Sequence, residues 1–489
     1  MVRVLTEFAL LSLLLAANRA CSRRAVGRRE MGEAVAGPKG GEETEMTVLD
    51  EWGDDNGPVV AEEEGESQTN RSGRDAAEGT SHSDSCSAGA GYSENTQGGS
   101  AKTDGDTVVE GPVQLSVRDR GLVTREVSAA SMLREHRAWH AAEADKVFQG
   151  EVLGYITPWN GRGYDFARTF RSKFTYISPV WYQLRGIPGV GESGTPTFSL
   201  AGGHDFDEAW VADVRDGVGA NETRDENAGW YVTKIVPRVV LEMRGNFQLS
   251  IEDLLHMAEL LVREALLRRY HGFVLDIPIT DGIEEFVSAI VRTGERSGIR
   301  LLIIQSIRPM GKLSPRQMEK LVPLVHRFSL MTYDYGPIGG RATGGVPNSP
   351  FSWIRECVEA LAPEGSGDEL RRKLLMGLPF YGYDNGRDIG YDAAVSILKG
   401  EQTEKSGGKK RAATALDEQE GDSDAPSLYW DLMSREHVIS YHGRDKVDHR
   451  ATYPTLLFIQ ERLQLAEELG VGVAVWELGH GMPYFFDLL

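Results

Sequence analysis

The chain has 489 residues, of which 40% are hydrophobic, and this is enough apolar material for a large core. Its formal net charge is −20, but residues 41–110 hold 18 acidic and three basic side chains, so this segment alone carries 3 − 18 = −15. The mildly acidic remainder excludes the basic surface typical of a nucleic-acid-binding protein. Cys21, Cys86 and Cys357 are too far apart in the sequence to indicate a disulfide framework or a metal site. No metal and no cofactor is therefore expected.

The N-terminus is typical of an export signal. Arg3 precedes the apolar run 8–17, which has the length of a signal-peptide core and is too short to span a bilayer. We predict a signal peptide over residues 1–20 and no membrane span after its removal. The mature protein is then expected in the secretory pathway, as an extracellular or endolysosomal protein. Asn70 and Asn221 lie in Asn-x-Ser/Thr sequons and are predicted glycosylation sites.

Two segments have a low-complexity composition. Residues 21–140 are predicted to be disordered, because their first part is rich in Gly, Ser, Glu and Asp and has too little apolar surface to offset the entropy of ordering. From about residue 113 to 142 the pattern becomes helical and mixed in charge. The second tract, 400–426, is predicted to be a surface loop inserted into a domain.

From about residue 145 to 489, apolar runs alternate with helical patterns, and the runs are typical of strands buried on both faces. The predicted strands are Val152–Ile156, Phe174–Val180, Lys234–Leu241, Gly272–Ile277, Arg300–Ile304, Phe328–Tyr333, Lys373–Leu378 and Val471–Trp476. The predicted helices are Leu249–Arg269, Gly282–Ser297, Ser314–Leu324, Phe351–Leu361 and Tyr453–Leu469.

This alternation predicts an α/β fold of the (β/α)8 TIM-barrel class, with a small insertion between strand 7 and helix 7. An open, doubly wound sheet is the alternative. It has less support, because no predicted strand is followed by a G-x-G-x-x-G phosphate loop.

Aromatic and acidic residues gather where the predicted strands end, which is where a barrel carries its function. They are Tyr155 and Trp159, Trp181 and Tyr182, Glu242, Tyr333 to Tyr335, Phe380 and Tyr381, and Trp476 and Glu477. Flat rings suit the apolar faces of sugars, and carboxylates suit their hydroxyl groups. The alternative is that half of these aromatic residues only pack in the core or at its rim.

Three of these strand ends resemble glycoside hydrolase family 18. Met331-Thr-Tyr-Asp-Tyr, Gly377-Leu-Pro-Phe-Tyr-Gly and Val475-Trp-Glu-Leu-Gly are similar to its sixth, seventh and eighth strands. Val152-Leu-Gly-Tyr-Ile-Thr-Pro-Trp-Asn and Ile235-Val-Pro-Arg resemble one chitinase-like branch of the family more closely. The resemblance covers about residues 145–489. It implies a barrel that binds N-acetylglucosamine-type oligosaccharides, such as chitin.

Active members of that family carry Asp-Gly-x-Asp-x-Asp-x-Glu at the end of the fourth strand. The Glu protonates the glycosidic oxygen, and the Asp two residues earlier holds the N-acetyl group of the substrate. Here the corresponding positions are His271, Gly272, Val274, Asp276 and Pro278. Proline has no titratable group, so the resemblance implies no catalytic residue in this motif, and Asp276 is its remnant.

The residues at the strand ends give a predicted substrate-binding set, which is Tyr155, Trp181, Asp276, Tyr333, Asp334 and Trp476. The resemblance implies that Tyr333 and Asp334 contact the central sugar and that this sugar lies on the ring of Trp476. Asp276 has an equally weighted alternative role as a structural carboxylate bonded to Tyr333 or Tyr155. His271 is expected to cap the start of its strand.

The sequence thus predicts an oligosaccharide-binding barrel without hydrolase activity, for which a sorting or scavenger receptor is an expected kind of partner. The first alternative is a weak or altered glycoside hydrolase in which Asp281 or Glu284 supplies a displaced acid. The second is a protein scaffold, which would require a blocked cleft.

Overall fold

The structure is a computed structural model, and it describes residues 107–187, 189, 196–217, 233–243, 249–279, 282–309, 315–335, 347–363, 368–402 and 425–489. Several sequence-based predictions lie outside these residues. They are the signal peptide, Asn70, Asn221, Asp281 and most of the 400–426 loop.

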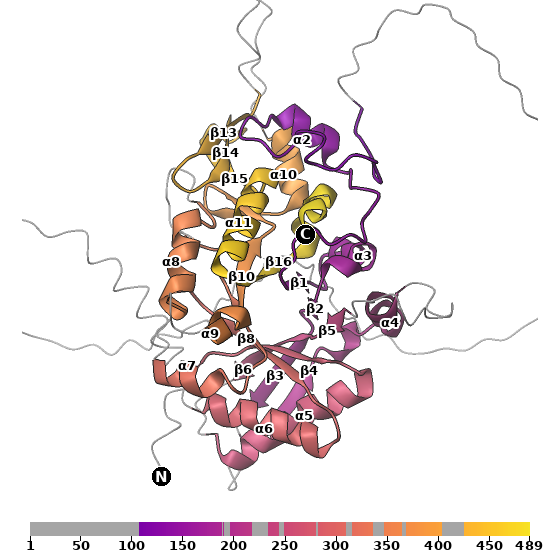
Figure 1. The fold of residues 1–489 in the computed structure, drawn as a ribbon, viewed down its shortest axis with the longest axis vertical. Helices are drawn as coiled ribbons and strands as arrows, with labels where there is room; N and C mark the ends of the chain where they lie inside the picture. Colours follow the sequence, from indigo (N-terminus) through magenta and orange to yellow (C-terminus); the bar gives the residue numbers. More distant parts are fainter. Residues whose placement is uncertain are drawn as a thin grey trace, which may run out of the picture. The chain divides into compact units, whose positions relative to one another are not determined.

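Eight parallel strands form a closed barrel in which neighbouring strands are hydrogen-bonded, and Figure 1 labels these strands and the helices around them. In ring order they are β1 (Val152–Ile156), β2 (Tyr176–Pro179), β5 (Lys234–Ile235) continued by β6 (Arg238–Met243), β7 (Gly272–Asp276), β8 (Leu302–Ile307), β9 (Arg327–Leu330), β10 (Leu374–Pro379) and β16 (Gly472–Trp476). Pairing of β16 with β1 closes the ring. The predicted TIM-barrel fold is therefore confirmed.

The third strand of the barrel bends between β5 and β6. β5 pairs with β2, and two residues later β6 pairs with β7, so Val236 and Pro237 carry the chain from one neighbour to the next. Beyond the bend, β6 also pairs with β3 (Tyr182–Ile187), which in turn pairs antiparallel with β4 (Thr197–Ala201). The sheet thus continues outside the ring as a hairpin.

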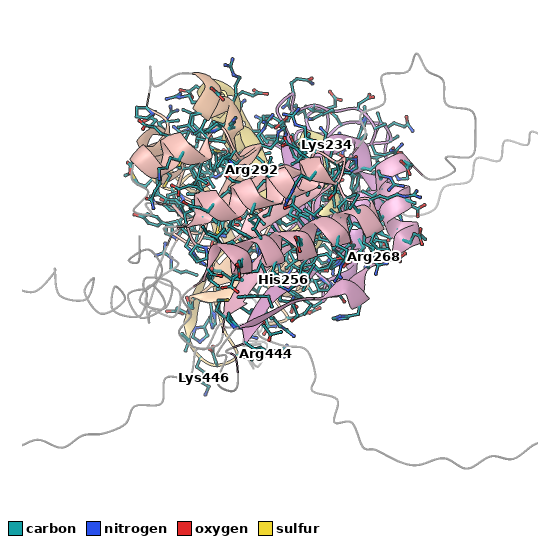
Figure 2. All side chains as sticks on the ribbon, turned by 90° about the horizontal axis from the view of Figure 1, so that it is seen from below. Lys234, His256, Arg268, Arg292, Arg444 and Lys446 are labelled. Carbon is teal, nitrogen blue, oxygen red and sulfur yellow. The ribbon has the colours of Figure 1, made fainter. Side chains whose placement is uncertain are left out.

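Helices cover the outside of the barrel. They are α3 (Gly161–Thr169), α4 (Glu208–Asp216), α5 (Ile251–Arg268), α6 (Ile283–Arg296), α7 (Pro315–Leu321), α8 (Phe351–Leu361), α9 (Asp368–Lys373) and α11 (Leu456–Leu469), with short 3-10 helices η1 (Arg171–Lys173), η2 (Gly203–Asp205), η3 (Leu478–His480) and η4 (Pro483–Leu488). Figure 2 shows α5 and α6 side by side, with His256 and Arg268 on α5 and Arg292 on α6.

Apolar side chains form two cores. The larger core lies between the barrel and its helices, where fully buried residues such as Phe273 and Ile290 meet. A smaller core fills the barrel and includes Leu153, Val274 and Ile304. Because successive strand residues point to opposite faces, the same strands supply both cores, which explains their continuous apolar runs.

The insertion after β10 is a second, antiparallel sheet. It comprises β11 (Gly382–Asp384), β12 (Arg387–Ile389), α10 (Tyr391–Leu398), β13 (Ser427–Asp431), β14 (Glu436–His442) and β15 (Asp448–Thr452). Its strand order is β12-β11-β15-β14-β13. The predicted insertion between strand 7 and helix 7 is confirmed, but the sequence analysis did not predict that it forms a sheet.

A fully buried arginine on α11 ties the insertion to the barrel. The guanidinium of Arg462 donates to the backbone carbonyls of Ser349 and Ser434, at 2.7 and 3.1 Å. Glu436 on β14 lies 4.0 Å away and accepts from the backbone N–H groups of Asn348 and Ser349. Burial lowers the pKa of Arg462 to about 10 and raises the pKa of Glu436. These bonds satisfy charges that would otherwise be costly to bury.

The segment 107–142, here called the N-terminal strap, is part of the folded unit. It contains α2 (Ala129–Glu135), and it buries Val117 and Met132, which are 1% and 3% exposed. The backbone N–H of His140 donates to Asp487 at 2.8 Å. The predicted disorder up to residue 140 is therefore wrong for residues 107–140, because their few apolar side chains join the larger core instead of remaining solvated.

Candidate functional site

The carboxyl ends of the barrel strands, here called the mouth, bring two predicted aromatic residues together. Tyr155 is the last residue but one of β1 and Trp476 ends β16, and their ring centroids are 5.1 Å apart. Tyr155 is buried and donates to the Ser329 hydroxyl at 2.9 Å, while burial raises its pKa to about 12. Trp476 is only half-buried. Tyr155 therefore supports the indole from below, and Trp476 offers the surface.

Asp276, the remnant of the acidic motif, forms an ion pair with an arginine on the neighbouring strand. Arg238 on β6 donates to Asp276 through Nε at 3.0 Å and also through Nη2. Burial tends to lower the pKa of Arg238, but the adjacent Asp276 outweighs this effect, so the pKa is raised. The alternative partners predicted for Asp276, Tyr333 and Tyr155, do not bond to it. The sequence signal was a charged residue, Arg238, inside the predicted strand Lys234–Leu241.

The other motif positions lie along β7 as strand alternation requires. Val274 is fully buried inside the barrel, and Pro278 is exposed just beyond the strand end. His271 lies before the strand, where its Nδ1 accepts from the backbone N–H of Ile235 at 3.1 Å. Burial lowers the pKa of His271. This position and bond fit its expected role as a cap.

Asp334 follows β9 and is held by three side chains. Its backbone N–H donates to Asn348 Oδ1 at 2.9 Å, and its carboxylate accepts from Tyr383 at 2.6 Å and from Tyr381. Its φ of 61° lies in the left-handed region, which aspartate tolerates better than most residues. Tyr383 belongs to β11, so the insertion contributes to the mouth. Sequence analysis missed Tyr383 and Asn348, because neither lies at the end of a predicted strand.

Tyr333 is predicted beside Asp334 and is 8% exposed. Its ring lies 6.1 Å from that of Tyr381, and burial raises its pKa well above the usual value. Tyr381 donates to the Asp334 carboxylate, so Tyr333 lies beside that pair. Tyr155, Asp276, Tyr333, Asp334 and Trp476 therefore share one region of the mouth.

Trp181 does not belong to this region, and its predicted role in sugar binding is wrong. The side chain is completely buried in an aromatic cluster between the sheet and its helices, where it packs edge-on against Trp210 and Phe206. Its Nε1 donates to the hydroxyl of Tyr164 at 2.7 Å. Trp181 was predicted because it follows a strand end. The side of the sheet to which its ring points depends on the irregular link between β2 and β3, which the sequence pattern does not show.

Two further acidic residues at strand ends, Glu242 and Glu477, already have protein partners. Glu242 pairs with Arg185 across β6 and β3 at 2.8 Å, at the surface. Glu477 is buried behind Trp476, where it accepts from Asn160 Nδ2 at 2.6 Å and from the backbone N–H of Gly479. Burial raises the pKa of Glu477 to about 7. Neither carboxylate lies beside Asp276.

The amino ends of the strands, here called the floor, carry a different polar cluster. Arg327 donates to Glu151 through Nη2 at 2.7 Å and through Nε, and to the His326 carbonyl through Nη1 at 2.7 Å. The Tyr176 hydroxyl lies 2.8 Å from His326 Nε2. Burial lowers the pKa of His326 to about 4. The cluster closes this end of the barrel.

Among the described residues, no three His, Cys, Asp or Glu side chains are arranged to hold a metal ion. Within the same part of the chain, no helix combines the length and hydropathy that a membrane crossing requires.

No protein-family model matches the chain. Among solved structures, it is similar to a family GH18 chitinase from Cycas revoluta in complex with allosamidin, with 12% identity, a TM-score of 0.49 and coverage of 69% of this chain and 98% of that one. A chitinase from Chromobacterium violaceum has 15% identity, a TM-score of 0.46 and the same coverages. The spore cortex-lytic enzyme SleL from Bacillus cereus has 15% identity, a TM-score of 0.47 and coverages of 69% and 73%.

Proposed function

We propose that this protein is a chitinase-like carbohydrate-binding barrel of glycoside hydrolase family 18 that lacks hydrolase activity. The observation that carries the proposal is Pro278, which stands where the family motif has its proton donor. Protonation of the leaving group is central to glycoside hydrolysis, and proline has no proton to give. The remaining motif carboxylate, Asp276, is engaged by Arg238.

Retained sugar binding is supported by the residues around this position. Trp476 presents a half-buried indole, Tyr155 packs beneath it, and Tyr333 and Asp334 lie in the same region. Aromatic faces and fixed polar groups suit the recognition of N-acetylglucosamine-type oligosaccharides. The motifs quoted above favour the chitinase domain-containing protein 1 branch of the family, also called the stabilin-1-interacting chitinase-like branch.

The alternative function is a weak or altered hydrolase with a displaced acid. Glu284, one of the two candidates, pairs with Lys320 of the neighbouring helix α7 at 3.1 Å. This pair directs its carboxylate toward the helical layer, which disfavours that role. Asp281, the second candidate, lies outside the described residues.

We also propose that the protein is exported and glycosylated. An apolar run near the N-terminus and the sequons at Asn70 and Asn221 support export, glycosylation and residence in the extracellular or endolysosomal lumen. A sorting or scavenger receptor is the proposed protein partner. Fractionation of cells that express the full chain, with and without residues 1–20, tests this route.

Turnover and binding assays on one purified sample test the central proposal. Hydrolysis of chromogenic chitobiosides and chitotriosides is expected at background, while a glycan array shows binding to N-acetylglucosamine oligomers. Pro278→Glu alone is expected to remain inactive, because Val274 leaves the motif without its middle Asp. Robust turnover that Asp281→Asn abolishes would establish the alternative, and an array without any bound glycan would refute carbohydrate binding.

A further inference from the structure

The Arg238–Asp276 pair places a cationic group at the mouth of the barrel. The Cζ atom of Arg238 lies 5.3 Å from the centroid of the Trp476 ring, so the guanidinium and the indole share one site. Nε and Nη2 are both used by Asp276, whereas Nη1 makes no hydrogen bond to a described residue. Nη1 of Arg238 is therefore an unused hydrogen-bond donor close to the Trp476 ring.

A second unused donor lies on the neighbouring strand. Ser178 alternates along β2 with Tyr176 and Val180, which both belong to the core inside the barrel, so its hydroxyl also faces inward. The side chain is completely buried, and its Oγ has no hydrogen-bond partner among the described residues. Ser178 is paired in register with Tyr155, whose ring contacts Trp476. A buried hydroxyl without a protein partner is rare and leaves a donor for a water molecule or another small polar group.

The charge at this site differs from that of the family motif. Of the acidic motif positions on β7, only Asp276 remains, and Arg238 neutralises it. Nearby Asp334 is held by two tyrosine hydroxyls. An anionic group is therefore repelled less than in an acid-lined mouth and meets the unused Nη1 donor of Arg238. A monoanion suits this site better than a dianion, because the Asp276 carboxylate lies beside the guanidinium.

We infer that the mouth selects an N-acetylhexosamine oligosaccharide that bears a carboxylate, with the sugar ring on Trp476 and the carboxylate at Arg238 Nη1. Arginine is the preferred residue for carboxylates, because its donors have a fixed planar geometry. The inference rests on the proposed carbohydrate-binding function and adds the chemical class of the ligand. Arg238 is then the residue that determines specificity.

Calorimetric titration with matched probes tests this inference. Chitobiose and the disaccharide N-acetylglucosaminyl-β-1,4-N-acetylmuramic acid differ only in the lactyl ether, which carries a carboxylate. A hyaluronan tetrasaccharide and its carboxyl-reduced form make a second pair, in which the carboxylate belongs to a uronic acid. We expect one of the two acidic probes to bind at least tenfold more tightly than its neutral counterpart, and the tighter one identifies the source of the carboxylate.

Two variants assign the effect to the mouth. Arg238→Met is expected to reduce the acidic-to-neutral affinity ratio to one or below, because Asp276 then lacks its counter-ion, and Asp276→Asn to increase it about threefold by removing the competing carboxylate. Arg327→Met breaks the corresponding ion pair at the floor with the same change of charge, and it should leave the ratio unchanged. Neutral probes that bind as tightly as acidic ones overturn the inference and leave sugar binding intact. If neither kind of probe binds, the proposed function itself fails.

Discussion

The two ends of the barrel each hold an arginine–carboxylate pair, but the surroundings of the pairs differ. At the floor, Arg327 uses Nε, Nη1 and Nη2 in hydrogen bonds to Glu151 and to the His326 carbonyl. At the mouth, Arg238 bonds to described residues through Nε and Nη2 alone, and its guanidinium lies beside Trp476. The same pair chemistry thus closes the barrel where all three guanidinium nitrogens donate, and it leaves one guanidinium nitrogen, Nη1, for a ligand at the mouth.

Removal of the N-terminal strap gives the largest expected loss of stability. It removes buried residues that belong neither to the mouth nor to the floor of the barrel. A chain that begins at Ala141 loses Val117 and Met132 and leaves Asp487 without the His140 N–H. Relative to a chain that begins at Thr107, it should lose about 5 kcal/mol of unfolding free energy. Urea unfolding of both chains measures this difference. Equal midpoints would show that the strap is dispensable.

The acidity of Glu477 should affect stability and not binding, although this residue follows Trp476 in the sequence. Burial raises its pKa to about 7 from 4.5, so the folded state binds a proton more tightly than the unfolded state. The associated stability is fully present below pH 4.5 and is lost as the pH rises through 7, by about 3 kcal/mol.

Glu477→Gln provides the comparison for this pH effect, because the amide keeps an acceptor for Asn160 and cannot titrate. Unfolding free energies of both proteins at pH 5 and pH 7.5 give the contribution of the carboxyl group. A wild-type protein whose pH dependence matches that of Glu477→Gln would contradict the prediction.

Arg327→Met breaks the floor pair and should cost about 2–3 kcal/mol of unfolding free energy, less than a fully buried pair, because both side chains are partly exposed. Binding of chitotriose should not change, since the floor lies at the opposite ends of the strands. Melting curves and calorimetry on the same sample separate the two effects. Weaker binding at unchanged stability would contradict the distinction between the ends.

Trp476→Ala tests the mouth, where we expect a change in binding and not in stability. If the indole is the surface on which the sugar lies, chitotriose binding should weaken by about 1–3 kcal/mol while the folded protein persists. The competing view is that Trp476 only packs against Tyr155. In that case the melting temperature falls, and the variant still binds normally at lower temperature.

The barrel could be predicted from the sequence because its strands are buried on both faces. Val152–Ile156 was predicted with the boundaries that β1 has, and Gly272–Ile277 exceeds β7 by one residue. The insertion was harder to predict, because β14 has neither a long apolar run nor a regular alternation and lies close to a low-complexity tract. The N-terminal strap was missed because its core contacts depend on a few isolated residues, such as Val117, and not on a periodic pattern.

The candidate site was predicted in part. Tyr155 and Trp476 were expected together and are in contact, since strand ends in a barrel meet at one face. Trp181 was wrongly included, because strand-end position does not fix the side of the sheet to which a ring turns. Arg238 was overlooked as the partner of Asp276, because residues 38 positions apart become neighbours only when the third and fourth strands pair.

Arg462 has a consequence for how this fold can be recombined. Its guanidinium lies on α11 and bonds to carbonyls at Ser349, before α8, and at Ser434, within the insertion. A transplant of residues 382–452 into another barrel would carry Glu436 but leave its cationic counterpart behind. The insertion is therefore not an interchangeable cassette: any graft, or any natural exchange between related barrels, must transfer α11 with it.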